Sequence, residues 1–342
     1  MTTDRIQRPL GMSGSRSHIV IDTRIFCYLI GLVLACGCGR VPEPPLRIAI
    51  NVWAGYECLF LAKELGYFEQ EGVDVELVEL TSLSDVRRAF ERGQVDGIAA
   101  TLTEVLQARE FSPRRLQIAL ICDFSAGADA IVAKSGINDV AALRGKRVGV
   151  EPASLGDYLL TRALESQQMS ADDVQITPLN QQDMLEAYST GVVDAIVTYP
   201  PVSIDAERFG GTTIFNSQQI PMEIVDIVAF DRDSPRCETE HIAAFVRSWD
   251  RAVAYMRDKP QHAYEIMAAR QGVSPDDFAA SLNGISIMTS TAQLEAWHPA
   301  GALQQAVTTV EQVLRRAGTL QGPSCKQDLL DPRFVVKAEV AP

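Results

Sequence analysis

The spacing of apolar positions changes repeatedly from Leu46 onward, and each spacing predicts one kind of element. Apolar residues that alternate or run together predict strands, and apolar residues three and four positions apart predict helices. Expected strands cover 46–53, 73–80, 97–102, 146–152, 174–179 and 195–200, and expected helices cover 58–68, 82–93, 155–168, 181–191 and 239–258. Strands that alternate with helices of this length are typical of parallel sheets covered on both faces. The predicted fold class is therefore α/β.

One helix-and-strand unit occurs twice. The segment AFERGQVDGIAAT at 89–101 returns as AYSTGVVDAIVTY at 187–199, an offset of 98 (187 − 89). We interpret the two copies as matching parts of two lobes, because open α/β sheets bind ligands at the carboxyl ends of their strands and two lobes can close over a ligand. The alternative is that Gly-x-Val-Asp recurs only as a convenient helix end and strand start.

Composition and charge exclude some classes of function. The chain has 342 residues, of which 46% are hydrophobic and 22% charged, enough for one large or two medium cores. Its formal net charge is −13, and no run of Lys or Arg interrupts the acidic background. A nucleic-acid-binding protein would carry a basic patch, so we expect no nucleic-acid partner.

The first 45 residues indicate export and anchoring. Arginines precede the apolar run IFCYLIGLVLA, which is too short to span a bilayer and has the order of a secretory signal. The run ends in VLAC, which resembles the bacterial lipobox, so Cys36 is the predicted lipidated residue. An uncleaved anchor or an ordinary signal peptide is the alternative, and Cys38 is a weaker alternative acceptor of the lipid. The Pro-rich stretch that follows reads as a tether, which places the protein on the periplasmic face of the bacterial cell envelope.

Cysteine and histidine patterns indicate no metal site. No CxxC occurs, and the four histidines lack ligand-like neighbours at metal-binding spacing. Cys58 and Cys122 lie in apolar sequence and are interpreted as buried residues, with a disulfide left open because the protein is exported. We expect no metal and no cofactor.

Three longer segments resemble a known family. These are NVWAGYECLFLAKELGYF, DFSAGADAIVAKSGINDVAALRGKRVGVEPASLGDYLL and GVVDAIVTYPP. They resemble the nitrate/sulfonate/taurine-binding proteins of bacterial ABC importers, a group that also includes thiamine-pyrimidine binders. The resemblance implies a bilobal type II periplasmic-binding fold with two parallel-rich sheets flanked by helices. It also implies two hinge crossovers, near 127–131 and 222–228.

The N-terminal signal pattern and the family resemblance together set the predicted limits and the expected function. The limits are a signal peptide at 1–35, a tether at 36–45, a first lobe at 46–129 and 223–342, and a second lobe at 130–222. The expected function is that of a monomeric, lipid-anchored protein that binds a small polar solute and delivers it to an ABC permease. Acidic residues near the strand ends favour an amine-bearing or zwitterionic solute. A sensor that docks onto a membrane signalling protein is the alternative from another class.

The strand ends supply the candidate binding residues. Trp53 and Tyr56 follow the first strand and form an aromatic platform, with core packing as the alternative for Trp53. Thr81, Ser82 and Thr101 follow the next two strands, where each hydroxyl could bind a ligand or only cap a helix.

Further candidates lie where the chain is expected to cross between lobes. Asp123, Ser125 and Asp129 flank small residues there, and Asp129 could instead cap local N–H groups. Ser154 opens a helix whose free N–H groups could receive an anion, or it could simply cap that helix. The remaining candidates are Tyr199 and Asp226.

Catalysis is not expected. Related proteins include pyrimidine-forming enzymes that consume their own His, but this chain has no His in a strand-end loop. No nucleophile elbow or P-loop is present. We therefore predict binding without turnover, with a pyrimidine-forming enzyme as the less favoured alternative.

Overall fold

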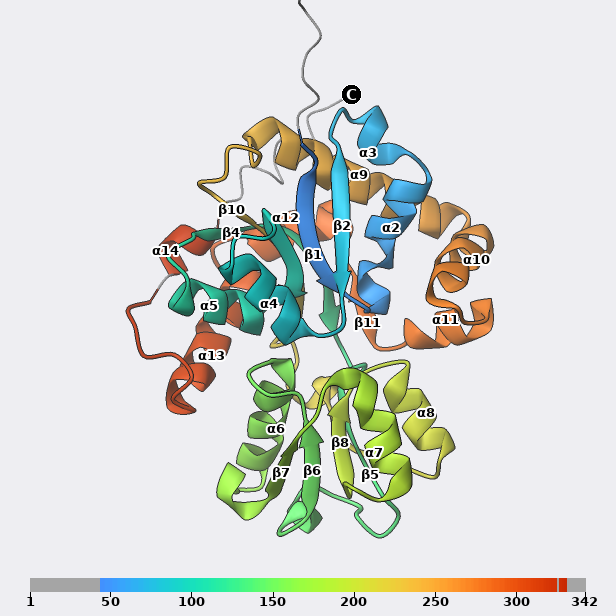
Figure 1. Cartoon of the computed structure of the whole chain (residues 1–342), viewed down its shortest axis with the longest axis vertical. Helices are drawn as coiled ribbons and strands as arrows, with labels where there is room; N and C mark the ends of the chain where they lie inside the picture. The colour runs from blue at the N-terminus through green and yellow to red at the C-terminus, as the bar shows by residue number, and fades with distance from the viewer. Residues whose placement is uncertain (1–43, 325, 331–342) are drawn as a thin grey trace, which may run out of the picture. The chain divides into compact units, whose positions relative to one another are not determined.

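The computed structural model describes residues 44–324 and 326–330. Within them the strands form two sheets, one in each lobe of the fold (Figure 1). The first sheet has the order β11 (Ile285–Ile287), β4 (Leu116–Ser125), β10 (Val225–Asp231), β3 (Gly97–Thr101), β1 (Leu46–Asn51), β2 (Val75–Leu80). The second has the order β7 (Gln175–Pro178), β6 (Arg147–Val150), β8 (Ala195–Thr198), β5 (Ala130–Ala133), β9 (Thr212–Asn216). The α/β prediction is confirmed.

Both sheets are mixed, and for the same reason. β1 pairs in parallel with β2 and β3, as β6 does with β7 and β8. The strands that carry the chain between the sheets pair antiparallel: β4 and β10 in the first sheet, β5 and β9 in the second. The parallel parts therefore come from strand–helix–strand units, and the antiparallel parts come from the two crossovers, with β11 added antiparallel to β4 at the edge of the first sheet.

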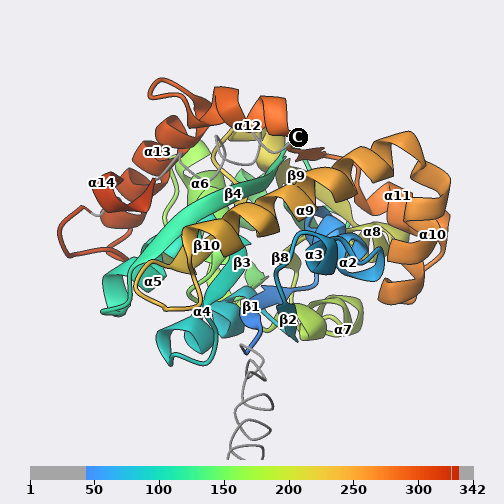
Figure 2. The same cartoon turned by 90° about the horizontal axis from the view of Figure 1, so that it is seen from above.

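Helices cover both faces of each sheet. α2 (Glu57–Glu64) and α9 (Thr239–Asp258) pack on one face of the first sheet, and α4 (Leu83–Glu91) and α5 (Leu102–Phe111) pack on the other (Figures 1 and 2). The first lobe also contains α3 (Tyr67–Gln70), α10 (Pro260–Gln271), α11 (Pro275–Ser281), α12 (Ser290–Trp297), α13 (Ala302–Arg316) and α14 (Lys326–Leu329). The second contains α6 (Leu155–Ser166), α7 (Met184–Thr190) and α8 (Val202–Arg208). Short 3₁₀ turns lie at Ala54–Tyr56, Ala141–Leu143, Ala171–Asp173, Gln181–Asp183 and Ser217–Gln219.

The strand cores follow the two-residue period of a sheet. In β1, Ile48 and Ile50 face the α2 and α9 side, while Ala49 between them faces the α4 and α5 side. All three side chains are fully buried, because helices cover both faces. The long α9 matches its predicted range of 239–258.

The repeated unit has the same structural role in each lobe. Asp96 precedes β3 and its Oδ2 accepts the N–H of Arg47 on β1 at 3.0 Å. Asp194 precedes β8 and its Oδ2 accepts the N–H of Arg147 on β6, also at 3.0 Å. Each aspartate thus fixes a strand to its parallel neighbour at the helix-to-strand turn. The repeat is architectural, as the two-lobe interpretation requires.

Two segments connect the sheets and lie side by side. Residues 126–129 link β4 to β5, and residues 217–224 link β9 to β10. The Ser125 and Ser217 hydroxyl oxygens are 2.8 Å apart, and the Gly127 N–H donates to Ser217 Oγ at 2.6 Å. Gly127 has φ +129°, a conformation that favours glycine. The lobe limits at 129/130 and 222/223 stay predictions.

Candidate functional site

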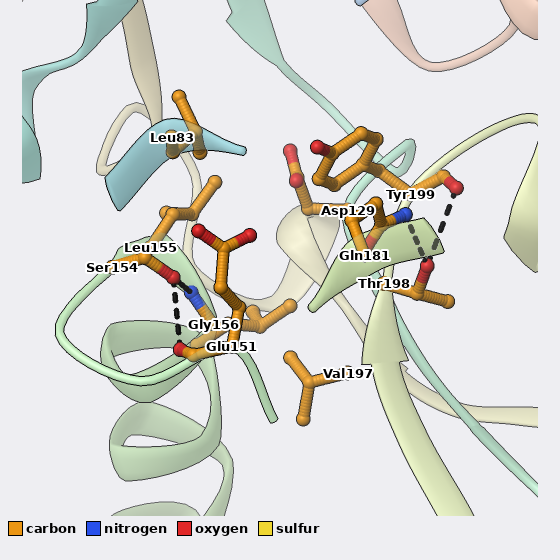
Figure 3. Close-up of a pocket in the computed structure, with 11 residues that line it drawn as sticks. Leu83, Asp129, Glu151, Ser154, Leu155, Gly156, Gln181, Val197, Thr198 and Tyr199 are labelled. Carbon is orange, nitrogen blue, oxygen red and sulfur yellow. Dashed lines mark hydrogen bonds between the residues drawn. The ribbon is translucent and has the colours of Figure 1, made fainter. Parts of the chain in front are cut away.

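A small cavity lies between the lobes at the carboxyl ends of their strands. Leu83 of α4 contributes from the first lobe, and Asp129, Glu151, Ser154 and Tyr199 contribute from the second lobe and its crossover (Figure 3). The volume open to the centre of a water molecule is about 10 Å³, room for about one water. The lobes therefore stand in a closed arrangement, and a larger solute requires them to separate or side chains to move.

Two aromatic rings and an asparagine form one part of the site. Trp53 and Tyr199 meet edge to face, with ring centroids 5.5 Å apart and planes at 88°. Asn51, the last residue of β1, donates from Nδ2 to the Tyr199 hydroxyl at 3.2 Å. Trp53 and Asn51 come from the first lobe and Tyr199 from the second, so these contacts join the lobes. Aromatic faces of this kind suit the apolar body of a small ligand.

Two buried aspartates lie directly opposite each other on neighbouring strands. Asp123 of β4 pairs in register with Asp226 of β10. Trp53 donates its indole N–H to Asp123 Oδ2 at 3.1 Å, and Tyr56 donates its hydroxyl to Asp226 Oδ1 at 2.5 Å. Burial raises the pKa of both carboxyl groups, and the charge of Asp123 raises the pKa of Asp226 further, whereas the Trp53 indole N–H partly opposes the rise at Asp123. The pair therefore holds at least one proton at neutral pH.

Three acceptors at the site lack a donor among the described residues. They are Asp129 Oδ2, Asn51 Oδ1 and Asp123 Oδ1. Of the two aspartates, Asp129 is the one that lines the cavity, where it lies beside the Tyr199 ring and is 3% exposed (Figure 3). Burial raises its pKa to about 6. A buried acceptor without a donor costs free energy, so these three atoms mark where a ligand could donate hydrogen bonds.

The helix end predicted to receive an anion is already occupied. Ser154 is the N-cap of α6 and accepts the Gly156 N–H at 3.2 Å. The N–H of Leu155, the first residue of α6, donates to Glu104 Oε1 of the first lobe at 2.8 Å. Glu104 is fully buried, its second oxygen accepts the Thr101 hydroxyl, and burial raises its pKa to about 7. A carboxylate of the chain thus occupies the position proposed for a ligand anion.

A second contact joins the lobes, with its N–H donor in the first lobe and its carboxyl acceptor in the second. Glu151 follows β6 in the second lobe, and its Oε1 accepts the Ser84 N–H in the first turn of α4 at 3.0 Å. In Figure 3 its carboxylate points into the space between Leu155 and Asp129. Burial raises the pKa of Glu151, and the Ser84 N–H partly opposes that rise.

The other hydroxyl candidates act mainly as caps. Ser82 caps α4 by accepting the Asp85 N–H at 3.1 Å, and Thr101 caps α5 by accepting the Thr103 N–H at 3.2 Å. Thr81 is exposed, and its hydroxyl donates to Asp85 at 3.0 Å, outside the cavity lining. Ser125 Oγ accepts the Asp129 N–H at 3.2 Å and so supports the crossover. Cys36 lies outside the described residues.

Residues 54–263 match the family described as NMT1/THI5 like. The chain belongs to this family. Relatives include the taurine-binding periplasmic protein of Escherichia coli strain K12, 22% identical over 79% of this chain and 88% of that protein. They also include the 4-amino-5-hydroxymethyl-2-methylpyrimidine phosphate synthase of Schizosaccharomyces pombe, 28% identical over 48% of this chain and 43% of that protein.

Solved structures show the same fold. The alkanesulfonate-binding protein of Xanthomonas axonopodis pv. citri, bound to MOPS, matches with a TM-score of 0.68 and 17% identity, covering 84% of this chain and 99% of that one. The desulfurization enzyme DSZB matches with a TM-score of 0.62 and 16% identity, covering 86% and 98%. The family fold therefore carries binding proteins and also enzymes, and the residues of the site must decide between the two.

Sequence reasoning missed several residues of this family member's site, among them Asn51 and Glu104. Asn51 could have been found as a polar residue at the end of an apolar strand, directly before the Trp53 loop. Glu104 carries the signal of a capping box, Thr-x-x-Glu, at the start of α5. That signal predicts a contact with Thr101 but not the contact with Leu155 in the other lobe.

The His262, Cys58 and Cys122 side chains, which could support metal binding or nucleophilic catalysis, lie away from the cavity or are buried. Within the described chain, no three His, Cys, Asp or Glu residues are placed to hold a metal ion, and no helix is both long and apolar enough to cross a membrane. His262 bonds the Tyr255 hydroxyl at 2.8 Å, away from the cavity. Cys58 and Cys122 are buried and free. Burial raises the pKa of both thiols, so neither is a ready nucleophile.

Proposed function

We propose that this protein is an extracytoplasmic solute-binding protein that holds a small amine-bearing or zwitterionic solute between its lobes. The observation that carries the proposal is the unpartnered Asp129 Oδ2, buried in the cavity that the aromatic ring of Tyr199 also lines. An ammonium group can donate to this oxygen and lie against an aromatic face. The relationship to a taurine-binding periplasmic protein supports the same class of solute.

The charges around the cavity favour a cationic group over a bare anion. Among the described residues that line it, Asp129 and Glu151 are acidic and none is basic. Glu57 and Glu223, also acidic residues near strand ends, are neutralised by Arg270 and Arg162 and so do not act on the solute. The solute should therefore present hydrogen-bond donors to the carboxyl groups.

A matched set of solutes tests the proposal. Calorimetry of the mature protein should detect 2-aminoethanesulfonate or a small primary amine, and should detect neither ethanesulfonate nor nitrate. Ethanesulfonate lacks only the amine, so it isolates that group. Tight binding of nitrate or of ethanesulfonate by the wild type would refute the amine-bearing class.

The second part of the proposal concerns location and partner. A diacylated Cys36 would hold the protein at the membrane surface, where it would deliver its solute to an ABC permease. Cys36→Ala should move the protein from the membrane fraction to the soluble fraction, because a second lipid signal is not evident in the sequence. Cys38→Ala, two residues away, is the matched control and should leave the protein at the membrane. Membrane association and lipid labelling that persist in Cys36→Ala would contradict the lipobox assignment.

A further inference from the structure

Two glutamates link the lobes, because each caps the start of a helix in the other lobe. Glu104, on α5 of the first lobe, accepts the Leu155 N–H at the start of α6 in the second lobe. Glu151, at the end of β6 in the second lobe, accepts the Ser84 N–H at the start of α4 in the first lobe. Because the exchange is reciprocal, separation of the lobes breaks both bonds at once. The two contacts together favour the closed arrangement.

Glu104 occupies a position that would otherwise attract a ligand anion. Free N–H groups at the N-terminus of a helix bind carboxylates, sulfonates and phosphates, and the helix dipole adds to the attraction. At α6 these groups are bonded within the chain: Ala153 N–H to Asp157, Leu155 N–H to Glu104 and Gly156 N–H to Ser154. An incoming anion would have to displace a fully buried carboxylate.

A second, independent observation in the same cavity points to a ligand that donates hydrogen bonds. Asp129 lines the cavity together with Ser154 and Leu155, is 3% exposed and has one oxygen without a donor. That oxygen needs a hydrogen-bond donor, whereas the helix end beside it already has its acceptor. Both features favour a cationic solute over an anion. The free oxygen of Asp129 attracts a donor group, and the occupied end of α6 leaves no place for an anion.

We propose that Glu104 is a specificity-determining residue, whose carboxylate occupies the anion position at α6 and so excludes nitrate, sulfonates that carry no amine, and other simple anions from the cleft. The proposal rests on the proposed function and names the residue that restricts its solute class. Asp129 attracts the amine, and Glu104 rejects the competitor that lacks one.

Chemical rescue tests the proposal directly. Glu104→Ala leaves the Leu155 N–H free and opens a space of carboxyl size, which acetate or methanesulfonate can fill. Either salt should raise the melting temperature of Glu104→Ala by about 2–4 °C over sodium chloride at equal ionic strength. The wild type should show no such difference. Glu104→Gln should not respond either, because its amide fills the space.

Glu186→Ala is the matched control, since Glu186 is an exposed acidic residue in the first turn of another second-lobe helix, α7. It should respond to acetate as the wild type does. Equal melting of Glu104→Ala in acetate and chloride would overturn the proposal. So would an equal acetate effect on the wild type.

Nuclear magnetic resonance of the wild type gives a second readout that does not depend on a variant that folds. The Leu155 amide should titrate together with Glu104 and should not shift when methanesulfonate is added. A saturable shift of that amide with methanesulfonate would overturn the proposal. Failure of the proposed function would look different. The wild type would then bind no amine, but acetate would still stabilise Glu104→Ala.

Discussion

At the scale of single residues, the site depends on which carboxyl groups have donors. Asp123 accepts the Trp53 indole N–H and Asp226 accepts the Tyr56 hydroxyl, while Asp123 Oδ1 has no donor among the described residues. Glu104 is satisfied across the cleft by Leu155. Asp129 also keeps one oxygen without a donor, and unlike Asp123 it lines the cavity. Among the buried carboxyl groups of the site, Asp129 is therefore the one we expect to contact the solute directly.

Replacing Asp129 tests this assignment. Asp129→Asn keeps the shape of the side chain but removes its charge, so an amine-bearing solute should bind more weakly by about 1.5–3 kcal/mol, the usual contribution of a charge-assisted hydrogen bond. Titration calorimetry measures the change. Asp139→Asn is the control, because Asp139 is an exposed cap that accepts the Ala142 N–H. Unchanged affinity in Asp129→Asn would reduce Asp129 to a residue that supports the crossover.

The sequence predicted which residues gather at the site better than what each one does. Trp53, Asp123, Asp129, Ser154 and Tyr199 were found because strand ends can be read from apolar patterns. Their partners are contributed by distant segments, as when Ser154 and Leu155 meet Glu104 across the lobes. Local spacing carries no information on such contacts, so the occupied helix end could not be predicted.

At the scale of elements, the repeated unit places the same contact, an aspartate that accepts a backbone N–H of the neighbouring strand, in both lobes. Asp96 and Asp194 accept the same kind of backbone N–H, but their surroundings differ. The Asp96 side chain is 1% exposed and also pairs with Arg236 and with the Ser234 hydroxyl. The Asp194 side chain is 24% exposed and pairs with the side chain of Arg147. Loss of the Asp96 contacts should therefore destabilise the fold more than loss of the Asp194 contacts.

Matched substitutions should reveal this difference. Asp96→Asn should lower the free energy of unfolding by about 2–3 kcal/mol, because it leaves buried donors without a charged acceptor. Asp194→Asn should cost about 1 kcal/mol or less, because solvent can replace its partners. Denaturant unfolding of the two variants measures both values. Equal costs, or a larger cost for Asp194→Asn, would show that burial does not set the strength of the shared contact.

Element boundaries were predicted closely where apolar spacing was clear. The strand predicted at 97–102 is observed as Gly97–Thr101, and the helix predicted at 155–168 as Leu155–Ser166. The helix predicted at 58–68 is divided instead, because Gly66 adopts φ +69° between α2 and α3. A glycine in this conformation ends a helix, and apolar spacing continues across it without a sign of the break.

At the scale of the whole molecule, closing the lobes buries several carboxyl groups at once. Asp123, Glu104 and Asp129 have pKa values raised by burial to about 8, about 7 and about 6. The folded protein therefore binds protons that the unfolded chain releases above about pH 4. In that range stability must fall as pH rises, since folding then requires either proton uptake or buried charge.

Acidic residues on the outside act in the opposite direction. Arg88 lowers the pKa of Asp85, and Arg147 lowers that of Asp194. Their contribution is present above the unfolded pKa, near 4, and is lost as pH falls through the lower folded value. The two effects together place maximal stability in mildly acidic solution.

The free energy of unfolding should accordingly be larger at pH 5.5 than at pH 8.5, by about 3 kcal/mol if one proton is retained across most of that range. Urea unfolding at constant ionic strength measures it. Asp123→Asn should make the profile less steep above pH 6, because the amide has no proton to lose and Asp226 then lacks its charged neighbour. Asp85→Asn should leave that part of the profile unchanged, since Asp85 titrates below it. A wild-type profile that is flat or rises between these two pH values would mean that the cleft carboxyls are hydrated in solution, and the lobes would then have to stand apart when no solute is bound.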